Sequence, residues 1–475
     1  MTISHDDYVR HDAVALASLV RARAVSPGEL LEAAIARAEA VNPRINAIAH
    51  RLYDMARAAV ATLPEGPFHG VPFAIKDLGI KMRGAPCTNG SKAYAGYVAP
   101  EDSTLMARYR AAGLNTFAVS TSPEFGLTTT TESAAFGATR NPWKLTHIAG
   151  GSSGGAAALV AAGVLPAANA SDGGGSIRIP AACCGLVGLK PTRGLVPKGP
   201  PYSEGWAGLG VTHVVSRSVR DTAALLDVTA GVEPGARYAS PVAAETYLAA
   251  MAQRPKGLRV AYMKKPLSGA DVHPECAAAA ENAARLLASM GHHVEEAVPA
   301  IDQPNLGLAQ GVIVVANIAR DIEEREAALG RKLRDDELEP VTRNYRDSAA
   351  KMTAAQYVWA DRTTQTAALQ LSRFFARYDV ILSATTAKPA VPIGELGLDN
   401  PDAGKHVADL VAFSGFPPLA NLTGVPSISL PLHMTKDGLP VGVMLTGALG
   451  AEPLLLSLSA AIEEAAPWVQ RRAPM

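Results

Sequence analysis

The spacing of apolar residues predicts a helix near the start of the chain. The segment Ser26-Pro27-Gly28-Glu29 has the form of a capping box with proline at the first helical position. It opens an alanine- and leucine-rich run from Leu30 to Val41. The pair Asn42-Pro43 follows, and proline disfavours the helical conformation in the residue before it. We therefore predict a helix that ends before Asn42.

Short apolar runs then alternate with segments of helical periodicity. The short apolar runs predict strands over residues 71–76, 115–120, 293–298, 380–382, 427–430 and 440–445. The segments of helical periodicity predict helices over residues 103–112, 156–163, 276–290 and 452–464. This alternation is typical of an α/β sheet covered by helices.

The segment from about 306 to 378 follows a different pattern. It is almost wholly helical in its periodicity and richer in charge than the rest of the chain. Residues 320–325 and 331–339 have the composition of solvated helix faces. We predict a helical layer or lid here, within a single domain that spans residues 1–475.

Composition excludes several classes of protein. Hydrophobic residues make up 48% of the 475 positions and charged residues 19%, as in a globular enzyme. Lys plus Arg equals Asp plus Glu at 44 each, which gives no support for binding nucleic acid or an anionic membrane. The N-terminus has no signal pattern, and no apolar stretch is long enough for a bilayer, so we expect a cytoplasmic protein. The cysteines, with no CxxC pair, are expected to be reduced buried thiols: Cys87, Cys183, Cys184 and Cys276.

Two serines, Ser152 and Ser176, lie in dense glycine runs at 150–155 and 173–176. Glycine lets backbone N–H groups approach a ligand closely, and several such groups can hold developing negative charge. A serine beside them is well placed as a nucleophile. Neither run is followed by the Lys-Ser or Lys-Thr of a phosphate-binding P-loop, which argues against nucleotide binding.

A serine nucleophile needs a base, and Lys76 is the strongest candidate. None of the eleven histidines lies in a recognisable triad motif. Lys76 follows the apolar run Val71–Ile75, where burial would lower its pKa. A shift from about 10.4 to near 7 costs roughly 4–5 kcal/mol. Asp77 would oppose this shift, but neighbouring strand side chains point to opposite faces, so we expect it to point away. Lys190 is an alternative base, for which we favour a packing role.

The segment from Gly150 to Thr192 resembles the signature of the amidase signature family, the Ser–cis-Ser–Lys hydrolases. Four further segments match this family: Gly70–Asp77, Thr139–Trp143, Arg217–Asp221 and Asn421–Pro426. Together they cover most of the chain outside residues 306–378, and their order and spacing argue strongly against chance. The resemblance implies an α/β fold with a mixed, mostly parallel central sheet covered by helices on both faces.

The resemblance also implies roles for individual residues. Ser176 matches the nucleophile, Ser152 the bridging serine that follows a cis peptide bond, and Lys76 the base. The backbone N–H groups of the second loop match the oxyanion hole: Gly173, Gly174, Gly175 and Ser176. Three residues are expected to support the loops: Asp172, Arg178 and Ser153.

Gly173 departs from the family pattern, which usually has a β-branched residue, often threonine, at this position. The glycine keeps its N–H donor, and it either loosens the loop or leaves room for a bulkier acyl group. Six residues are candidates for the substrate wall: Met82, Pro123, Glu124, Phe125, Gly126 and Trp206. Because aromatic residues make up only 5% of the chain, we expect an aliphatic pocket.

The implied activity is hydrolysis of carboxylic amide bonds through a serine acyl-enzyme, on non-peptide secondary amides. Two alternatives remain open at this point. One is hydrolysis of carbamates (urethanes) or aryl esters on the same triad, and the other is the glutaminase subunit of a tRNA-dependent amidotransferase. We expect a small-molecule amide or carbamate as partner, no cofactor or metal, no nucleic acid and no membrane; a homodimer is left open.

Overall fold

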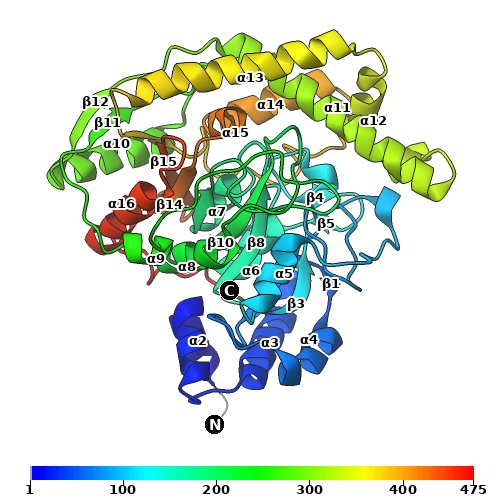
Figure 1. Ribbon diagram of the computed structural model, residues 1–475, viewed down its shortest axis with the longest axis vertical. Helices are drawn as coiled ribbons and strands as arrows, with labels where there is room; N and C mark the ends of the chain where they lie inside the picture. The colour runs from blue at the N-terminus through cyan, green and yellow to red at the C-terminus, as the bar shows by residue number, and fades with distance from the viewer. Residues whose placement is uncertain (1–2) are drawn as a thin grey trace.

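An eight-stranded sheet crosses the molecule in the order β12-β11-β13-β15-β14-β9-β10-β8 (Figure 1). A computed structural model describes residues 3–475. Its strands are β1 Ile48–Arg51, β2 Pro72–Lys76, β3 Asn115–Ser120, β4 Glu132–Ser133, β5 Gly137–Ala138, β6 Arg140–Asn141, β7 Lys144–Ile148, β8 Ala167–Asp172, β9 Val187–Lys190, β10 Val211–Ser216, β11 Arg259–Tyr262, β12 His293–Glu296, β13 Val380–Ala384, β14 Ser427–Met434 and β15 Pro440–Gly447. The α-helices are α1 His5–Arg10, α2 Ala13–Arg21, α3 Pro27–Ile45, α4 Tyr53–Ala59, α5 Thr104–Ala111, α6 Gly154–Ala161, α7 Arg178–Cys184, α8 Val219–Thr229, α9 Tyr247–Ala250, α10 Pro274–Ser289, α11 Gln303–Leu329, α12 Pro340–Ala349, α13 Ala354–Phe375, α14 Ala403–Ser414, α15 Pro418–Thr423 and α16 Glu452–Ala465.

The sheet is mixed and flanked by helices, as expected, but the expectation that it is mostly parallel is wrong. Only the pairs β11–β12 and β11–β13 are parallel. The other five neighbouring pairs are antiparallel. The reason is visible at β14 and β15, which are joined by the short turn at 435–439, and so short a connection permits only an antiparallel pair.

A small sheet of order β1-β3-β2 lies beside the large one and positions Lys76. Strand β3 is central in this sheet and pairs with β2 in the parallel direction. Strand β2 packs against β8, and the backbone N–H of Lys76 donates to Asn169 Oδ1 at 3.2 Å. The end of β2 is therefore fixed next to the strand that leads into the second glycine loop.

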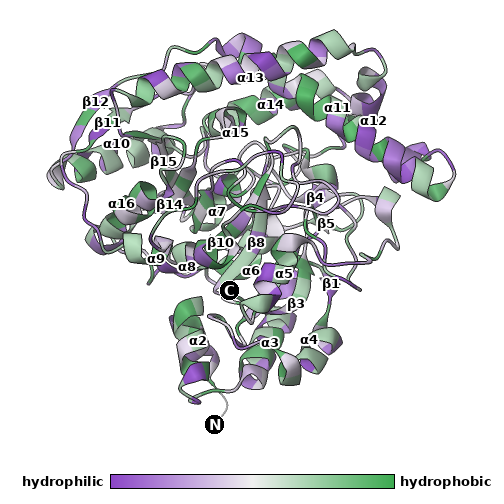
Figure 2. Ribbon diagram, in the orientation of Figure 1, coloured by the Kyte–Doolittle hydropathy of each residue, from purple (hydrophilic) through white to green (hydrophobic). Residues whose placement is uncertain are grey.

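The predicted helical layer at 306–378 consists of α11, α12 and α13, which pack on one another along one end of the molecule (Figure 1). Much of α12 and the adjoining end of α11 is hydrophilic (Figure 2), and this end of α11 includes residues 320–325. The solvated helix face expected at 331–339 is wrong, because this segment holds only a short 3₁₀ turn at Asp335–Glu337 and buries Leu333, Glu337, Leu338 and Glu339. Helix α3 differs from the prediction, because it continues through Pro43 to Ile45. The Asn42 carboxamide accepts hydrogen bonds from Ala47 N and Ile48 N and so secures this end of the helix.

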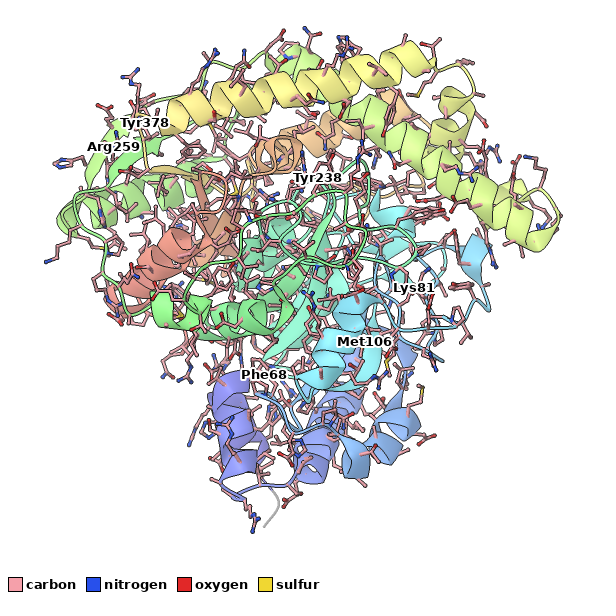
Figure 3. All side chains as sticks on the ribbon, in the orientation of Figure 1. Phe68, Lys81, Met106, Tyr238, Arg259 and Tyr378 are labelled. Atoms are coloured by element: carbon pink, nitrogen blue, oxygen red, sulfur yellow. The ribbon has the colours of Figure 1, made fainter. Side chains whose placement is uncertain are left out.

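A hydrophobic core connects the N-terminal helices, both sheets and the C-terminal helix. Phe68 and Met106, labelled in Figure 3, are each 1% exposed and belong to it. All four cysteines are free and buried, as predicted. Within residues 3–475, no helix is both long enough and apolar enough to cross a membrane.

Candidate active site

The first glycine loop connects β7 to α6 and is secured by Thr131. The Thr131 hydroxyl donates to Gly150 O at 3.0 Å and accepts from Gly154 N at 2.9 Å. The peptide bond between Gly151 and Ser152 is cis, as the family resemblance implies. A side chain at position 151 would overlap the Thr130 carbonyl oxygen, so glycine is required there.

Lys76 lies beneath this loop and contacts two serine hydroxyls. Its Nζ atom donates to Ser152 Oγ at 2.7 Å and to Ser171 Oγ at 2.9 Å. The side chain is fully buried. Burial lowers the pKa of Lys76 to about 7, against the opposing effect of the Asp172 carboxylate. With a pKa of about 7, about half of this lysine is neutral at neutral pH and able to accept a proton.

Asp77 points away from Lys76, as predicted from strand alternation. Its carboxylate accepts hydrogen bonds from the Thr88 backbone N–H, from the Thr88 hydroxyl and from Gly90 N. Burial raises the pKa of Asp77 to about 6. Asp77 therefore holds the 88–90 turn and leaves Lys76 with its serine partners.

The second glycine loop connects β8 to α7 and is braced by a buried ion pair. Arg178 donates from Nε and Nη2 to the two carboxylate oxygens of Asp172, each at 3.0 Å, and neither side chain is exposed. Burial alone would raise the pKa of Asp172, but the Arg178 charge and hydrogen bonds from Arg178 and Asn421 hold it well below its usual range. The expected supporting role of this pair agrees with these contacts. Ser153 joins the first loop to β8, because its hydroxyl donates to Ser171 O at 3.1 Å and accepts from Ser171 N at 3.2 Å.

One of the predicted oxyanion donors, Gly175, already has a partner within the loop. Its backbone N–H donates to Asp172 Oδ1 at 2.7 Å, as part of the brace that holds the loop. The N–H groups of Gly173, Gly174 and Ser176 stay as the predicted donors.

The space opened by Gly173 is occupied by an indole ring. A Cβ atom at position 173 would lie 2.8 Å from Cε3 and from Cζ3 of Trp206. A threonine there would displace the ring. The departure from the family pattern therefore allows Trp206 to pack directly against the second glycine loop.

Ser152, Ser171 and Ser176 line one cavity of about 770 Å³, together with Gly173. Helix α11 and the loop at 198–211 form other parts of its wall. Of the predicted wall residues, Phe125, Gly126 and Trp206 line it, whereas Met82, Pro123 and Glu124 do not belong to its described lining. The expectation of an aliphatic pocket is wrong, because aromatic side chains scattered in sequence converge here: Tyr94, Tyr97, Phe125, Tyr202, Trp206 and Tyr357.

Comparison with known proteins identifies the family of this chain. The sequence profile of the family described as Amidase matches residues 29–456. The chain belongs to the amidase family. It is 40% identical over 474 residues to the 6-aminohexanoate-cyclic-dimer hydrolase of Pseudomonas sp. (strain NK87), covering 97% of this chain and 96% of that protein. Its structure is similar to that of a 6-aminohexanoate cyclic dimer hydrolase, with a TM-score of 0.93, 39% identity and coverage of 98% and 99% of the two chains. It is also similar to a bacterial aryl acylamidase of the amidase signature family, with a TM-score of 0.88, 29% identity and coverage of 97% of each chain. The protein is an amidase, a hydrolase of amide bonds.

The alternative base, Lys190, has a different environment in this amidase. Its side chain is fully buried, and Nζ donates to Pro191 O at 2.8 Å. Among the described residues, no hydrogen bond joins it to a serine hydroxyl. These contacts fit the packing role favoured from the sequence.

Sequence reasoning missed three polar residues of the amidase site. Ser171 is the second serine partner of Lys76, Thr131 secures the first loop, and Asn421 donates to Asp172 Oδ1 at 2.8 Å. Two signals were present. Ser171 directly precedes the Asp172–Ser176 loop, and Asn421 begins one of the segments that resemble the family.

Proposed function

We propose that this amidase hydrolyses secondary amides of non-peptide compounds through an acyl-enzyme on Ser176. The observation that carries the proposal is the 2.7 Å hydrogen bond from Lys76 Nζ to Ser152 Oγ at the edge of a cavity that Ser176 also lines. The similarity to a hydrolase of the 6-aminohexanoate cyclic dimer supports a non-peptide amide as substrate.

The first half of the proposed reaction forms the acyl-enzyme. Neutral Lys76 accepts the proton of Ser152, which takes the proton of Ser176 as its oxygen bonds to the substrate carbonyl carbon. The resulting oxyanion accepts hydrogen bonds from the N–H groups of Gly173, Gly174 and Ser176. Loss of one such donor costs on the order of 3 kcal/mol of transition-state stabilisation.

The second half releases the products. The ammonium of Lys76 returns its proton through Ser152 to the leaving nitrogen as the carbon–nitrogen bond breaks, and the amine departs. Water then loses a proton along the same route and attacks the ester on Ser176. The carboxylic acid leaves, and Ser176 regains its hydroxyl proton.

Carbamates and aryl esters present a carbonyl to the same nucleophile, so they belong in the test. Glutamine is the least expected substrate, because the cavity combines aromatic side chains with its polar groups and is large, which favours a bigger and partly apolar compound.

The experiment compares kcat/KM of the purified chain on aliphatic amides, anilides, carbamates, aryl esters and glutamine. We expect the highest value on hydrophobic secondary amides and none above background in Ser176→Ala. As a matched control, Ser372→Ala removes an exposed hydroxyl on α13 and should retain full activity. A preference for glutamine, or wild-type turnover by Ser176→Ala, would refute the proposal.

A further inference from the structure

The cavity is larger than the scissile amide alone requires. Its volume of about 770 Å³ lies in the range of pockets that enclose a drug-sized molecule. The catalytic serines lie on β8 and the glycine loops, whereas α11 contributes a separate wall that carries Asp321. A substrate that fills this volume has atoms well beyond the bond that is cleaved.

Two charged side chains lack partners in the wall formed by α11 and the loop at 198–211. Within residues 3–475, neither Lys198 Nζ nor the Asp321 carboxylate makes a hydrogen bond or ion pair. The other charged residues of this wall do have partners. Arg320 pairs with Glu324 at 3.1 Å, Glu204 pairs with Arg237 at 2.8 Å, and Arg325 Nε donates to Ala93 O at 2.8 Å. Lys198 and Asp321 are thus the exceptions within this wall.

The position of Lys198 is fixed by its surroundings. A side chain at Gly205 would collide with Lys198 Nζ, so the ammonium lies directly over that glycine. The Lys198 backbone N–H donates to Glu233 Oε1 at 3.1 Å. Tyr238, labelled in Figure 3, packs against Gly208, and Arg193 Nε donates to Gly208 O at 2.8 Å. The segment that carries Lys198 is therefore braced rather than free.

Lys198 and Asp321 line the same cavity and each affects the pKa of the other, but no ion pair joins them within the described residues. Burial lowers the pKa of Lys198, and the Asp321 and Glu204 carboxylates oppose that shift. Burial raises the pKa of Asp321 to about 6, and Lys198 opposes that shift. Both groups line the cavity, so a ligand that excludes water from them must supply hydrogen-bond partners in its place. A ligand that supplies the missing partners would therefore bind favourably.

The charges of this wall select a neutral, dipolar ligand group. The basic residues Lys198, Arg320 and Arg325 are balanced by three acidic residues. A carboxylate would suit Lys198 but face the acidic residues Glu204, Asp321 and Glu324. An ammonium would suit Asp321 but face Lys198. A secondary amide has a carbonyl acceptor and an N–H donor on adjacent atoms, which satisfies both.

We propose that Lys198 and Asp321 form a subsite for a second amide or carbamate group, whose carbonyl accepts from Lys198 Nζ and whose N–H donates to Asp321. This inference rests on the proposed function and deepens it, because it makes compounds with two such groups the preferred substrates. The subsite is formed by the loop at 198–211 and by α11.

The test uses three ligands of equal length. The first has two secondary amides, the second has an ethylene unit in place of the distal amide, and the third has an N-methylated distal amide. Dissociation constants are measured by calorimetry in the Ser176→Ala background, so that binding is separate from turnover. We expect the diamide to bind at least tenfold more tightly than the other two.

The variants assign each hydrogen bond. Lys198→Met should raise the dissociation constants of the diamide and of the N-methylated ligand at least tenfold. Asp321→Leu should raise the dissociation constant of the diamide alone. For the second ligand, which has a single amide (the monoamide), both variants should have dissociation constants within twofold of that of the Ser176→Ala protein. This result also shows that the cavity is intact. The control Lys256→Met removes an exposed lysine and should change nothing.

Equal affinity for the three ligands, or equal losses on all of them in the variants, would overturn the subsite. Tighter binding of a ligand that ends in a carboxylate would also overturn it and assign Lys198 to an anion. The proposed function is judged separately, by turnover of the monoamide in the enzyme that retains Ser176.

Discussion

Lys76 and Lys190 are both fully buried, and burial lowers the pKa of each to about 7. Their hydrogen-bond partners differ. Lys76 contacts two hydroxyl groups, which hold protons, whereas Lys190 contacts a carbonyl oxygen, which holds none. A neutral lysine acts as a base only when an acidic hydrogen faces it. The partner, rather than the pKa, therefore distinguishes the proposed base, Lys76, from Lys190.

Replacing each lysine by methionine separates these roles. Lys76→Met should lower kcat on an amide by about 10³-fold, within the usual range for loss of a general base. Lys190→Met removes a lysine of similar burial and should keep kcat within a few fold of wild type. Steady-state kinetics on matched enzyme preparations provide the measurement, and equal losses in the two variants would contradict the assignment.

The pH dependence follows from the lowered pKa of Lys76. Acidification protonates this lysine and removes the base, so kcat/KM should fall as the pH decreases through about 7, in a titration that involves one proton. A pH profile of kcat/KM checks this.

Asp172 and Asp77 favour the charged form of Lys76, whereas Lys198 disfavours it. Lys198→Met should therefore raise the pKa of Lys76 and shift the acid limb of the profile, in which kcat/KM declines on acidification, to higher pH. A limb that stays in place, or shifts to lower pH, would show that Lys198 does not act on Lys76.

At the scale of elements, the two glycine loops have different braces. The first is tied by neutral hydrogen bonds to Thr131, and the second by the buried pair of Asp172 and Arg178. Removing one member of a buried ion pair leaves the other charge without compensation, which is far more costly than losing an exposed pair. The second loop is therefore the more sensitive to substitution.

Arg178→Met should lower the free energy of unfolding by about 3–5 kcal/mol. Arg285→Met breaks the exposed pair with Glu281 and should change the free energy of unfolding by less than about 1 kcal/mol. Chemical denaturation of both variants tests the difference. A similar effect in both would mean that the Asp172–Arg178 pair does not hold the loop.

The contact between Gly173 and Trp206 gives a second prediction at this scale. Gly173→Thr should displace the indole and lower kcat/KM on a bulky amide by about tenfold, since the displaced ring disturbs the wall beside the nucleophile. Adding Trp206→Ala should recover part of that loss, because the two side chains no longer compete. Losses that simply add in the double variant would indicate that the residues are independent.

Element prediction from the sequence succeeded where patterns were strong. The apolar runs located β2 and β3, and the helical periodicity of residues 103–112 located α5, whose N-cap is Ser103. Strand β8 was outside the prediction, because Ala167–Asp172 consists mostly of small and polar residues with weak strand preference. It is a strand because it pairs with β10 along its whole length. This missing strand explains why Ser171 was not recognised as a neighbour of Lys76.

At the scale of the whole molecule, the sheet order mixes distant parts of the chain. Strand β9 lies between β14 and β10, and β13 lies between β11 and β15. Strand order of this kind depends on long-range pairing that a local pattern does not record, which is also why the parallel share of the sheet was overestimated. A cut between β9 and β14 would separate strands β8–β10 from strands β11–β15, but a β9–β14 ladder joins the two sets and both contribute to one hydrophobic core.

We accordingly propose that the chain is a single cooperative domain. Differential scanning calorimetry should show one unfolding transition, with equal calorimetric and van't Hoff enthalpies. Two separated transitions, or early unfolding of residues 303–375 by hydrogen exchange, would instead make the helical layer a separate unit.

The central claim is that Ser176 is the nucleophile and that neutral Lys76 activates it through Ser152. The most direct measurement is reaction with a sulfonyl fluoride, followed by peptide mapping by mass spectrometry. We predict one covalent adduct per chain, on Ser176, with labelling much slower in Lys76→Met. An adduct on another residue, together with loss of amide hydrolysis, would contradict the account.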